Sequence, residues 1–372
     1  MNIDNLRWFA RKAFLVVLAG GVLSGCDALP GVGSSNKAPK FETKNSGLVF
    51  GGRFDPEPIY WLDNDRALFP AYANEKRLGP DGKEDWAPPG LFIWDTRNNI
   101  YKRHADLGKE NFFCYNTGFV TYTTHTEEDR TKWIQYEGQF GSERPLPPGS
   151  ATNWEGHQPY YAACPRIEPE KLLRPEHRGQ RVSAWFLREQ DGYLNLGISD
   201  EPLKLRNPDD LVKYYRKGQA EPIELPILAK EMLSTAKLTF SDYAGKYVIV
   251  PGNAKSRDMS NSVRSWPNRM PIPIYLLSPD GKVETLQIPY GTWFPGRAFL
   301  TRKGLFWISS DAPSTNSKQA GGWLLQDGKA VKLFEHLPEG AGVSPDGCKI
   351  AYAYNDYNRS TTEFVHVIEL CQ

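Results

Sequence analysis

Short apolar stretches alternate with polar turns along most of this chain, with the two-residue period that is typical of β-strands. Two kinds of hairpin recur. The more apolar kind begins at Pro58, Phe112, Arg181, Lys237 and Arg297. Each is followed by a more polar hairpin with Asn or Gly at its turn, beginning at Gly90, Trp133, Val212, Ile274 and Gly322. Two hairpins make one four-stranded unit, so the sequence predicts five such units.

The C-terminal region contains three strands of a sixth unit. GVSPDGCKIAYAY from Gly342 predicts a hairpin, and FVHVIEL from Phe364 predicts a single strand. SGLVFGG from Ser46 is able to supply the fourth strand, which would close a β-propeller and remove a free sheet edge. We therefore predict an all-β fold over 46–372, a six-bladed β-propeller of four-stranded antiparallel blades. Seven blades, with one hidden in the insert 148–180, or a two-sheet sandwich are the alternatives.

Two turns carry a sequence resemblance. Ser344-Pro345-Asp346-Gly347 followed by Lys349-Ile350-Ala351-Tyr352 resembles the S-P-D-G-K-x-I-A-[FY] repeat of propellers such as the periplasmic one of the Tol system. Residues 278–282 match the repeat more loosely and lie in a different hairpin. The resemblance implies a propeller and carries no function.

The N-terminus has the pattern of an export signal. Arg7, Arg11 and Lys12 precede an apolar run, 13–22, that is too short to cross a bilayer about 30 Å thick. The run ends in Leu-Ser-Gly-Cys26, which resembles the lipobox of bacterial lipoproteins. The resemblance implies that 1–25 is a signal peptide and that Cys26 receives a diacylglycerol and a further acyl chain such as palmitate. The alternative is an ordinary signal peptide in which this cysteine is incidental.

Residues 26–45 are rich in Gly, Pro, Ser and Asn and predict a flexible tether. A random-coil tether of this length spans about 25 Å. Asp27 resembles the enteric signal for retention in the inner membrane, and the outer membrane is the alternative. We expect a domain held by lipid on the periplasmic side of a bacterial membrane.

Composition supports a turn-rich fold and gives no reason to expect a nucleic-acid partner. The chain has 33 glycines, 29 prolines and 13% aromatic residues. Removing 1–25 takes away three positive side chains and one negative one, so the formal charge changes from +1 to −1. A nearly neutral chain lacks the basic surplus that nucleic-acid binding requires.

The mature chain has four cysteines besides Cys26, which permits two disulfides in an oxidising compartment. Of the three possible pairings we favour Cys114 with Cys164 and Cys348 with Cys371, because these pairs close the shorter loops. Free buried thiols are the alternative. The absence of a C-x-x-C motif disfavours a thiol oxidoreductase and a zinc knuckle.

The long connections all fall between the second and third strands of a unit or between two units. They are 72–89, 148–180, 199–210, 253–271, 311–321 and 355–363. In a four-stranded blade both kinds of connection leave on the same side, so this side is the candidate binding face.

Two of these connections carry candidate binding residues. The first, 148–180, contains Trp154, His157, Tyr160 and Tyr161, which are suited to gripping a sugar or a partner protein, and its end predicts a short helix around 168–177. The second, 253–271, has a local charge excess of +3 and contains Arg257, Arg264, Trp266 and Arg269. Packing of the insert on the rim and simple solvation of the charges are the alternatives.

Catalytic motifs are sparse. The six histidines include no H-E-x-x-H or other metal spacing, so no metal or cofactor is expected. Ser344 lies in GVSPDG rather than in a G-x-S-x-G elbow and is interpreted as a turn residue, while His366 alternates with apolar neighbours and is interpreted as structural. Carboxylate pairs for glycoside hydrolysis would leave no linear motif in a propeller. No residue is assigned a catalytic role.

The leading hypothesis is a non-catalytic, lipid-anchored module whose loop-rich face docks another envelope protein. A narrower version makes that partner a toxic effector and this chain its immunity protein. The rival hypothesis is an envelope protein that binds or cleaves carbohydrate.

Overall fold

The computed structural model describes residues 41–50, 59–73, 76–78, 84–108, 113–116, 118–125, 133–147, 173–178, 182–188, 190–198, 209–232, 236–252, 271–289, 295–309, 321–335, 338–354 and 364–371, and the structural statements below concern these residues. They form almost entirely antiparallel β-structure. The strands make six four-stranded groups, called blades 1 to 6 here in chain order.

Blade 1 contains β2 (Tyr60–Trp61), β3 (Arg66–Tyr72), β6 (Gly90–Asp95) and β7 (Ile100–Asp106). Blade 2 contains β8 (Phe113–Asn116), β9 (Phe119–His125), β10 (Trp133–Gln139) and β11 (Arg144–Pro145). Blade 3 contains β12 (Val182–Phe186), β13 (Gly192–Ile198), β14 (Leu211–Arg216) and β15 (Ile223–Leu228). Blade 4 contains β16 (Lys237–Ser241), β17 (Lys246–Val250), β18 (Ile272–Leu277) and β19 (Val283–Ile288). Blade 5 contains β20 (Pro295–Thr301), β21 (Gly304–Ser309), β22 (Gly321–Gln326) and β23 (Lys329–Glu335). Blade 6 contains β24 (Pro338–Val343), β25 (Lys349–Tyr354), β26 (Phe364–Glu369) and β1 (Glu42–Phe50).

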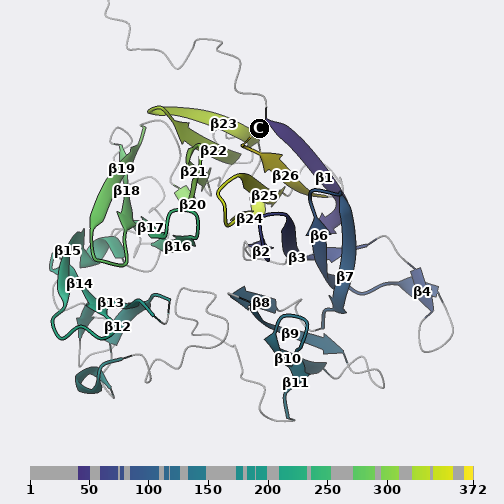
Figure 1. Cartoon of the computed structure of the whole chain (residues 1–372), viewed down its shortest axis with the longest axis horizontal. Helices are drawn as coiled ribbons and strands as arrows, with labels where there is room; N and C mark the ends of the chain where they lie inside the picture. The colour runs from purple at the N-terminus through teal and green to yellow at the C-terminus, as the bar shows by residue number, and fades with distance from the viewer. Residues whose placement is uncertain are drawn as a thin grey trace, which may run out of the picture. The chain divides into compact units, whose positions relative to one another are not determined.

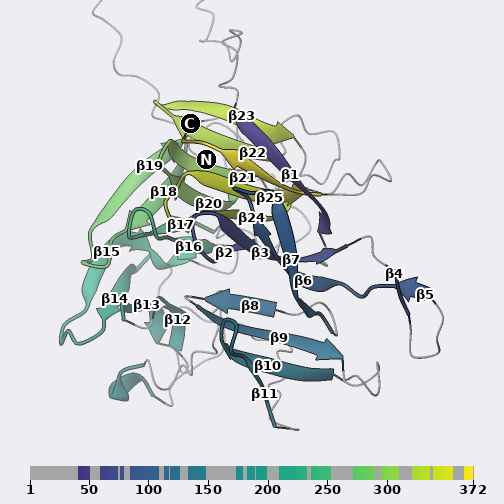
Figure 2. The ribbon, with the colours of Figure 1, turned by 45° about the vertical axis from the view of Figure 1, so that its right-hand side comes forward.

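Three short elements lie outside the blades. A two-stranded hairpin, β4 (Lys76–Leu78) and β5 (Glu84–Trp86), is separate from the blade sheets in both ribbon views (Figures 1 and 2). The 3-10 turns are η2 (Pro175–His177) and η3 (Ala229–Met232). The helix predicted around 168–177 is therefore a single 3-10 turn in its described part, and 168–172 lie outside the described residues. Within the described ranges, no helix has the length and apolarity that crossing a membrane requires.

The first strand of each blade lies toward a common centre and the last lies toward the rim (Figure 1). This arrangement confirms the predicted all-β propeller of four-stranded antiparallel blades and is not that of a two-sheet sandwich. Most of 148–180 lies outside the described residues, so the number of blades in the whole chain stays a prediction.

The N-terminal strand completes the last blade, as predicted. β1 pairs with β26 from Glu42 opposite Glu369 to Val49 opposite Phe364. Its last two residues also pair with β3, which joins blades 6 and 1 into one eight-stranded sheet. The strand starts at Glu42, earlier than the predicted start at Ser46.

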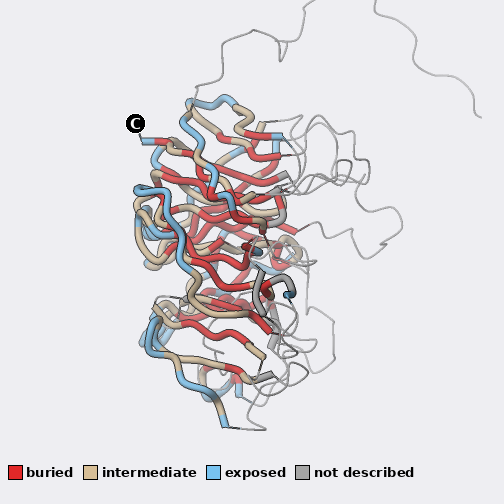
Figure 3. The backbone as a smooth tube through the Cα atoms, turned by 90° about the vertical axis from the view of Figure 1, so that its right-hand side faces the viewer, coloured by how far each residue is buried: buried red, intermediate tan, exposed pale blue. Residues whose placement is uncertain are grey.

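Burial follows the position of a strand within its blade. The middle strands β17 and β18 are buried along nearly their whole length, because both faces of a blade pack against neighbouring blades. The rim strands β7 and β19 are largely exposed or half-buried. Figure 3 shows the buried residues along the strands, with exposed residues gathered at turns on one side. The second hairpin of each pair contains the exposed rim strand, which explains why the first hairpin is the more apolar one.

Hydrophobic clusters join successive blades. One contains Leu194 and Val212 of blade 3 with Ile249 and Leu277 of blade 4. Corresponding clusters join blade 4 to 5, blade 5 to 6, blade 6 to 1 and blade 1 to 2. Each fully buried Leu, Ile, Val or Phe contributes about 1.5–3 kcal/mol, so these inter-blade layers are the main favourable term holding the blades together.

Candidate functional site

The strand order gives the propeller two different sides. Connections between the first and second strands and between the third and fourth strands are short, none being longer than 217–222. We call the side that carries them the short-turn side. Connections between the second and third strands include 73–89, 199–210 and 251–271, and the longest connection between blades is 146–181. We call the side that carries them the long-connection side.

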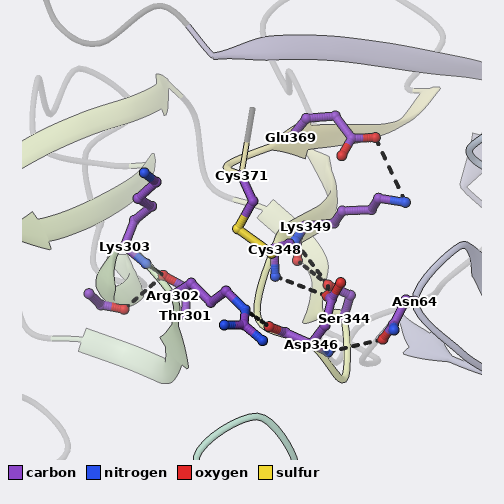
Figure 4. Close-up of a disulfide and its surroundings, with 11 residues drawn as sticks. Asn64, Thr301, Arg302, Lys303, Ser344, Asp346, Cys348, Lys349, Glu369 and Cys371 are labelled. Atoms are coloured by element: carbon purple, nitrogen blue, oxygen red, sulfur yellow. Dashed lines mark hydrogen bonds and ion pairs between the residues drawn. A yellow bond between two sulfur atoms is a disulfide. The ribbon is translucent and has the colours of Figure 1, made fainter.

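Turns of neighbouring blades contact one another on the short-turn side (Figure 4). The Nε of Arg302 in blade 5 donates to the carbonyl of Asp346 in blade 6 at 2.8 Å, and the Arg302 N–H donates to the Gly347 carbonyl at 2.9 Å. The Asp346 N–H donates to Oδ1 of Asn64 in blade 1 at 3.0 Å. Three blades are thus linked by hydrogen bonds through their innermost turns.

An exposed tyrosine lies among these turns. Tyr243 of blade 4 is 41% exposed, and the Arg302 guanidinium carbon lies over its ring at 4.8 Å. A Cβ at Gly347 would lie 2.9 Å from Cγ of Tyr243, and Gly347 has a φ of +74°, so glycine is required at this position for both reasons. The turn therefore provides a flat support for the ring.

Blades 3 and 4 meet in a polar contact on the same side. Nη1 of Arg188 lies 3.5 Å from Oδ1 of Asp242, and its guanidinium covers the Phe240 ring at 4.3 Å. Although 57% of the Asp242 side chain is exposed, the surrounding turns limit its hydration and raise the pKa of its carboxyl, an effect that Arg188 opposes. Next to this pair, the Tyr247 hydroxyl donates to the Asp191 carboxylate and accepts from the Arg188 N–H at 3.0 Å. Burial, followed by the Asp191 hydrogen bond, raises the pKa of Tyr247.

The contact between blades 6 and 1 contains a buried lysine. Lys349 is 8% exposed, and its Nζ contacts Oδ1 of Asp65, Oγ1 of Thr96 at 3.3 Å and Oε1 of Glu369 at 3.9 Å. From β1, Lys44 contacts the same Glu369 oxygen at 3.4 Å and donates to the Thr96 carbonyl at 3.1 Å. We call this set of five side chains, together with β1, the closure. The sequence signal for it is a lysine at the start of an otherwise apolar strand, and our sequence reading did not use it.

The predicted Cys348–Cys371 disulfide is confirmed and lies beside the closure, with a Cα–Cα distance of 5.1 Å (Figure 4). Cys114 is buried, and its predicted partner Cys164 lies outside the described residues, so that pairing stays a prediction. Ser344 is a turn residue, as predicted, because its hydroxyl donates to Asp346 at 2.6 Å and accepts from the Lys349 N–H at 2.9 Å.

The described part of the insert, 173–178, packs on blade 3. Leu173 is buried against Phe186 and Tyr193, and His177 is 5% exposed. Nδ1 of His177 lies 2.6 Å from the Tyr193 hydroxyl. The Arg174 guanidinium covers the Tyr215 ring at 4.6 Å and donates to the carbonyls of Gln219 and Ala220. Sequence reasoning gave no role to His177, whose only signal was its place at the end of the insert.

Another histidine lies between blades 1 and 2. Nε2 of His104 in β7 lies 3.1 Å from Oε1 of Glu143 in blade 2, and its ring stacks on Phe140 at 4.5 Å. Tyr122 lies edge-on to the same ring, and burial raises its pKa to about 12. The predicted structural residue His366 stacks on Tyr352 at 5.4 Å. In these contacts His104 packs between two blades, His366 within a blade, and His177 between the insert and blade 3.

The eight predicted binding residues lie outside the described residues. They are Trp154, His157, Tyr160, Tyr161, Arg257, Arg264, Trp266 and Arg269. A search of the described part of the chain finds no group of three or more His, Cys, Asp or Glu side chains with the geometry to hold a metal ion. The candidate binding face therefore rests on the strand order, and its side-chain chemistry stays a prediction.

No protein-family model and no curated protein matches the sequence. Among solved structures, the chain is similar to an oligogalacturonate lyase in complex with manganese, with 10% identity, a TM-score of 0.42, and coverage of 89% of this chain and 94% of the lyase chain. For a chain of the mitotic checkpoint complex, the identity is 10%, the TM-score 0.42, and the coverage 95% of this chain and 100% of that chain. For TolB from Acinetobacter baumannii, the identity is 13%, the TM-score 0.35, and the coverage 84% of this chain and 66% of TolB. At these values we take neither fold nor function from the likenesses, and the fold rests on the strand pairing.

Proposed function

We propose that this chain is a lipid-anchored, non-catalytic protein of the bacterial periplasm that docks another envelope protein on its long-connection side. The observation that carries the proposal is the unequal length of the connections on the two sides of the propeller. Elaborated connections on one side of a rigid β-framework are the usual place for recognition. The inter-blade clusters and turn contacts supply the rigid framework.

The lipid anchor is supported by the Leu-Ser-Gly-Cys26 motif after a short apolar run. In this proposal Cys26 carries the lipid, and Asp27 favours the inner membrane over the outer one. Replacing Cys26 with Ser is expected to move the protein out of the membrane fraction, and the lipid mass is expected to disappear from the N-terminal peptide. An unchanged membrane fraction for Cys26→Ser would contradict the anchor.

The point where the tether enters the domain suggests which side faces the lipid. β1 begins at Glu42, opposite Glu369 and on the short-turn side, where the Cys348–Cys371 disulfide also lies. In this proposal β1 is the first described strand after the lipid-bearing Cys26, which favours a short-turn side that faces the membrane.

The docking proposal is tested by affinity capture from gently solubilised envelopes. The wild-type protein is expected to recover a stoichiometric partner, and replacing 253–270 or 148–172 with a short Gly-Ser linker is expected to abolish recovery. A matched control replaces exposed rim residues Ile100 and Tyr101 with Ser, which leaves the long-connection side intact. The proposal would be overturned if the partner were lost only in the rim control. It would also be overturned if the wild-type protein captured no partner after mild cross-linking.

The narrower version of the proposal makes the partner a toxic effector. A neighbouring gene for a secreted lipase or peptidoglycan hydrolase would then be toxic when expressed alone. Co-expression of this chain would restore growth, and the rescue would require 148–172 or 253–270. The carbohydrate alternative predicts binding to envelope polysaccharides, or release of new reducing ends, by the purified protein. A positive glycan assay without a protein partner would replace docking with that function.

A further inference from the structure

A histidine at the end of the longest connection fastens that connection to blade 3. The segment 173–178 lies just before β12 and ends the connection 146–181. Its buried residues are Leu173 and His177, and His177 is only 5% exposed. Two backbone hydrogen bonds shape the segment, from the His177 N–H to the Arg174 carbonyl at 2.9 Å and from the Arg178 N–H to the Pro175 carbonyl at 3.2 Å. We call 173–178 the latch.

His177 and Tyr193 share a short hydrogen bond in a buried contact. Nδ1 of His177 lies 2.6 Å from the Tyr193 hydroxyl, and in the neutral imidazole this nitrogen is able to accept the hydroxyl proton. A protonated imidazole has no acceptor nitrogen, so it is able only to donate to the hydroxyl oxygen. Its charge would then lie in a site where His177 is 5% exposed to water.

Burial among aromatic rings removes water from His177 and so disfavours a positive charge on it. Its ring lies edge-on to Tyr215 with centroids 4.9 Å apart, and Tyr215 in turn stacks on Tyr193 at 5.1 Å. On the other side of Tyr215 lies the Arg174 guanidinium. The charged groups of the latch are Arg174, Glu176 and Arg178, and the titratable groups that blade 3 presents to the ring are the phenols of Tyr193 and Tyr215.

We propose that the latch is an acid-released fastening, in which protonation of His177 frees 173–178 from blade 3 and so loosens the end of the 146–181 connection. At neutral pH the His177–Tyr193 hydrogen bond and the aromatic packing hold it closed. In acid, the charged ring leaves the aromatic site for water. The latch itself does not depend on any partner, whereas its effect on docking rests on the proposed function.

Burial lowers the pKa of His177 below its ordinary value of 6.5, and Arg174 adds to this while Glu176 opposes it. The closed latch therefore binds the proton more weakly than the open latch does. Opening is expected to increase by up to about tenfold for each pH unit below 6.5, until the pKa of the closed state is reached.

The test is amide hydrogen exchange of the mature chain at pH 7.5 and 5.5, corrected for the intrinsic pH dependence of exchange. Peptides covering 173–178 are expected to lose protection at pH 5.5, while peptides covering β17 stay protected at both pH values. His177→Gln removes the titration and is expected to give the same protection at both pH values. His104→Gln is the matched control and is expected to keep the wild-type response, because His104 lies between blades 1 and 2.

Two results would overturn the proposal. One is equal protection of the wild-type latch at both pH values, and the other is a pH response in His177→Gln equal to that of the wild type. If His177→Gln opens the latch at neutral pH, it no longer reports on protonation, and Tyr193→Phe then tests whether the hydrogen bond holds the latch closed. It is expected to weaken protection at pH 7.5, whereas unchanged protection with the full pH response would show that the hydrogen bond is not the fastening. If the wild-type protein shows the expected pH response of the latch but captures no partner, only the proposed function is contradicted.

Discussion

The closure and the latch both fasten one segment to a distant sheet, and they do so with different chemistry. At the closure, two lysines, two carboxylates and a threonine satisfy one another next to a disulfide. At the latch, a buried histidine shares one hydrogen bond with the Tyr193 hydroxyl within an aromatic site. The closure is held by ion pairs beside a disulfide, whereas the latch depends on a buried histidine whose pKa burial holds below its ordinary value.

The different chemistry of the closure and the latch corresponds to the part of the molecule that each one holds in place. The closure completes the propeller, so opening it would expose the inter-blade core around Leu48 and Phe50 of β1. The latch holds only the end of a connection, so it is able to open without exposing that core. A fold of this kind permits local opening of 173–178 while the framework stays intact.

The largest effect is expected from removing the buried lysine of the closure. Lys349→Met leaves Glu369 and Asp65 without their shared cation and should lower the free energy of unfolding by about 2–4 kcal/mol. Lys246→Met is the matched control, because the Lys246–Glu284 pair, at 2.6 Å, includes a 60% exposed carboxylate side chain and should change stability by less than about 1 kcal/mol. Urea denaturation measures both. Equal, small changes in the two variants would mean that the lysine cluster does not hold the blades together.

A similar but purely covalent effect is expected at the disulfide. Replacing Cys348 and Cys371 together with Ser opens a loop with a sequence separation of 23. By loop-closure entropy this should destabilise the protein by about 3 kcal/mol. Thermal unfolding of the double variant, compared with the oxidised wild-type protein, measures this loss. A reduced wild-type protein with unchanged stability would argue that the bond adds nothing beyond β1 pairing.

The strand β1 of the closure and the disulfide beside it could be predicted from sequence, because strand period and turn residues are local signals. The missing fourth strand of the last blade pointed to the segment at Ser46, and loop length pointed to Cys348 with Cys371. The lysine cluster was not predictable, since Lys349, Asp65 and Lys44 come from three distant strands or turns and leave no linear motif.

The latch was less predictable still. A single histidine at the end of an insert carries no periodicity, and its partner Tyr193 looks like any inward-facing strand residue. Only the three-dimensional contact between the insert and blade 3 identifies it. The predicted aromatic and basic residues of 148–180 and 253–271 remain predictions for a similar reason, because their roles depend on contacts that sequence period does not encode.

Acid is expected to affect both regions by a moderate amount. Burial lowers the pKa of His177 and of His366, which lies in β26 opposite Asn45 of β1. The unfolded chain takes up these protons near pH 6.5 while the folded chain does not, so stability is fully present above that pH and falls as the pH drops below it. Each unit of pKa difference is worth about 1.4 kcal/mol. Urea midpoints measured from pH 7.5 to 5.5 should fall, and His366→Gln should flatten this global dependence more than His177→Gln, because the latch opens locally.

The smallest effect is expected from removing one hydroxyl group. Tyr193→Phe keeps the ring contacts with His177 and Tyr215 but removes the hydroxyl that hydrogen-bonds to His177, and should lower the free energy of unfolding at pH 7.5 by about 0.5–1.5 kcal/mol. At pH 5.5 the wild-type bond is already broken in the open latch, so the difference between variant and wild type should shrink. Tyr214→Phe is the matched control, because the Tyr214 hydroxyl donates to backbone carbonyls of Asp191 and Pro279, which do not titrate. Its cost should be the same at both pH values, and a cost that shrinks equally in both variants would assign the pH response to the blades and not to the latch.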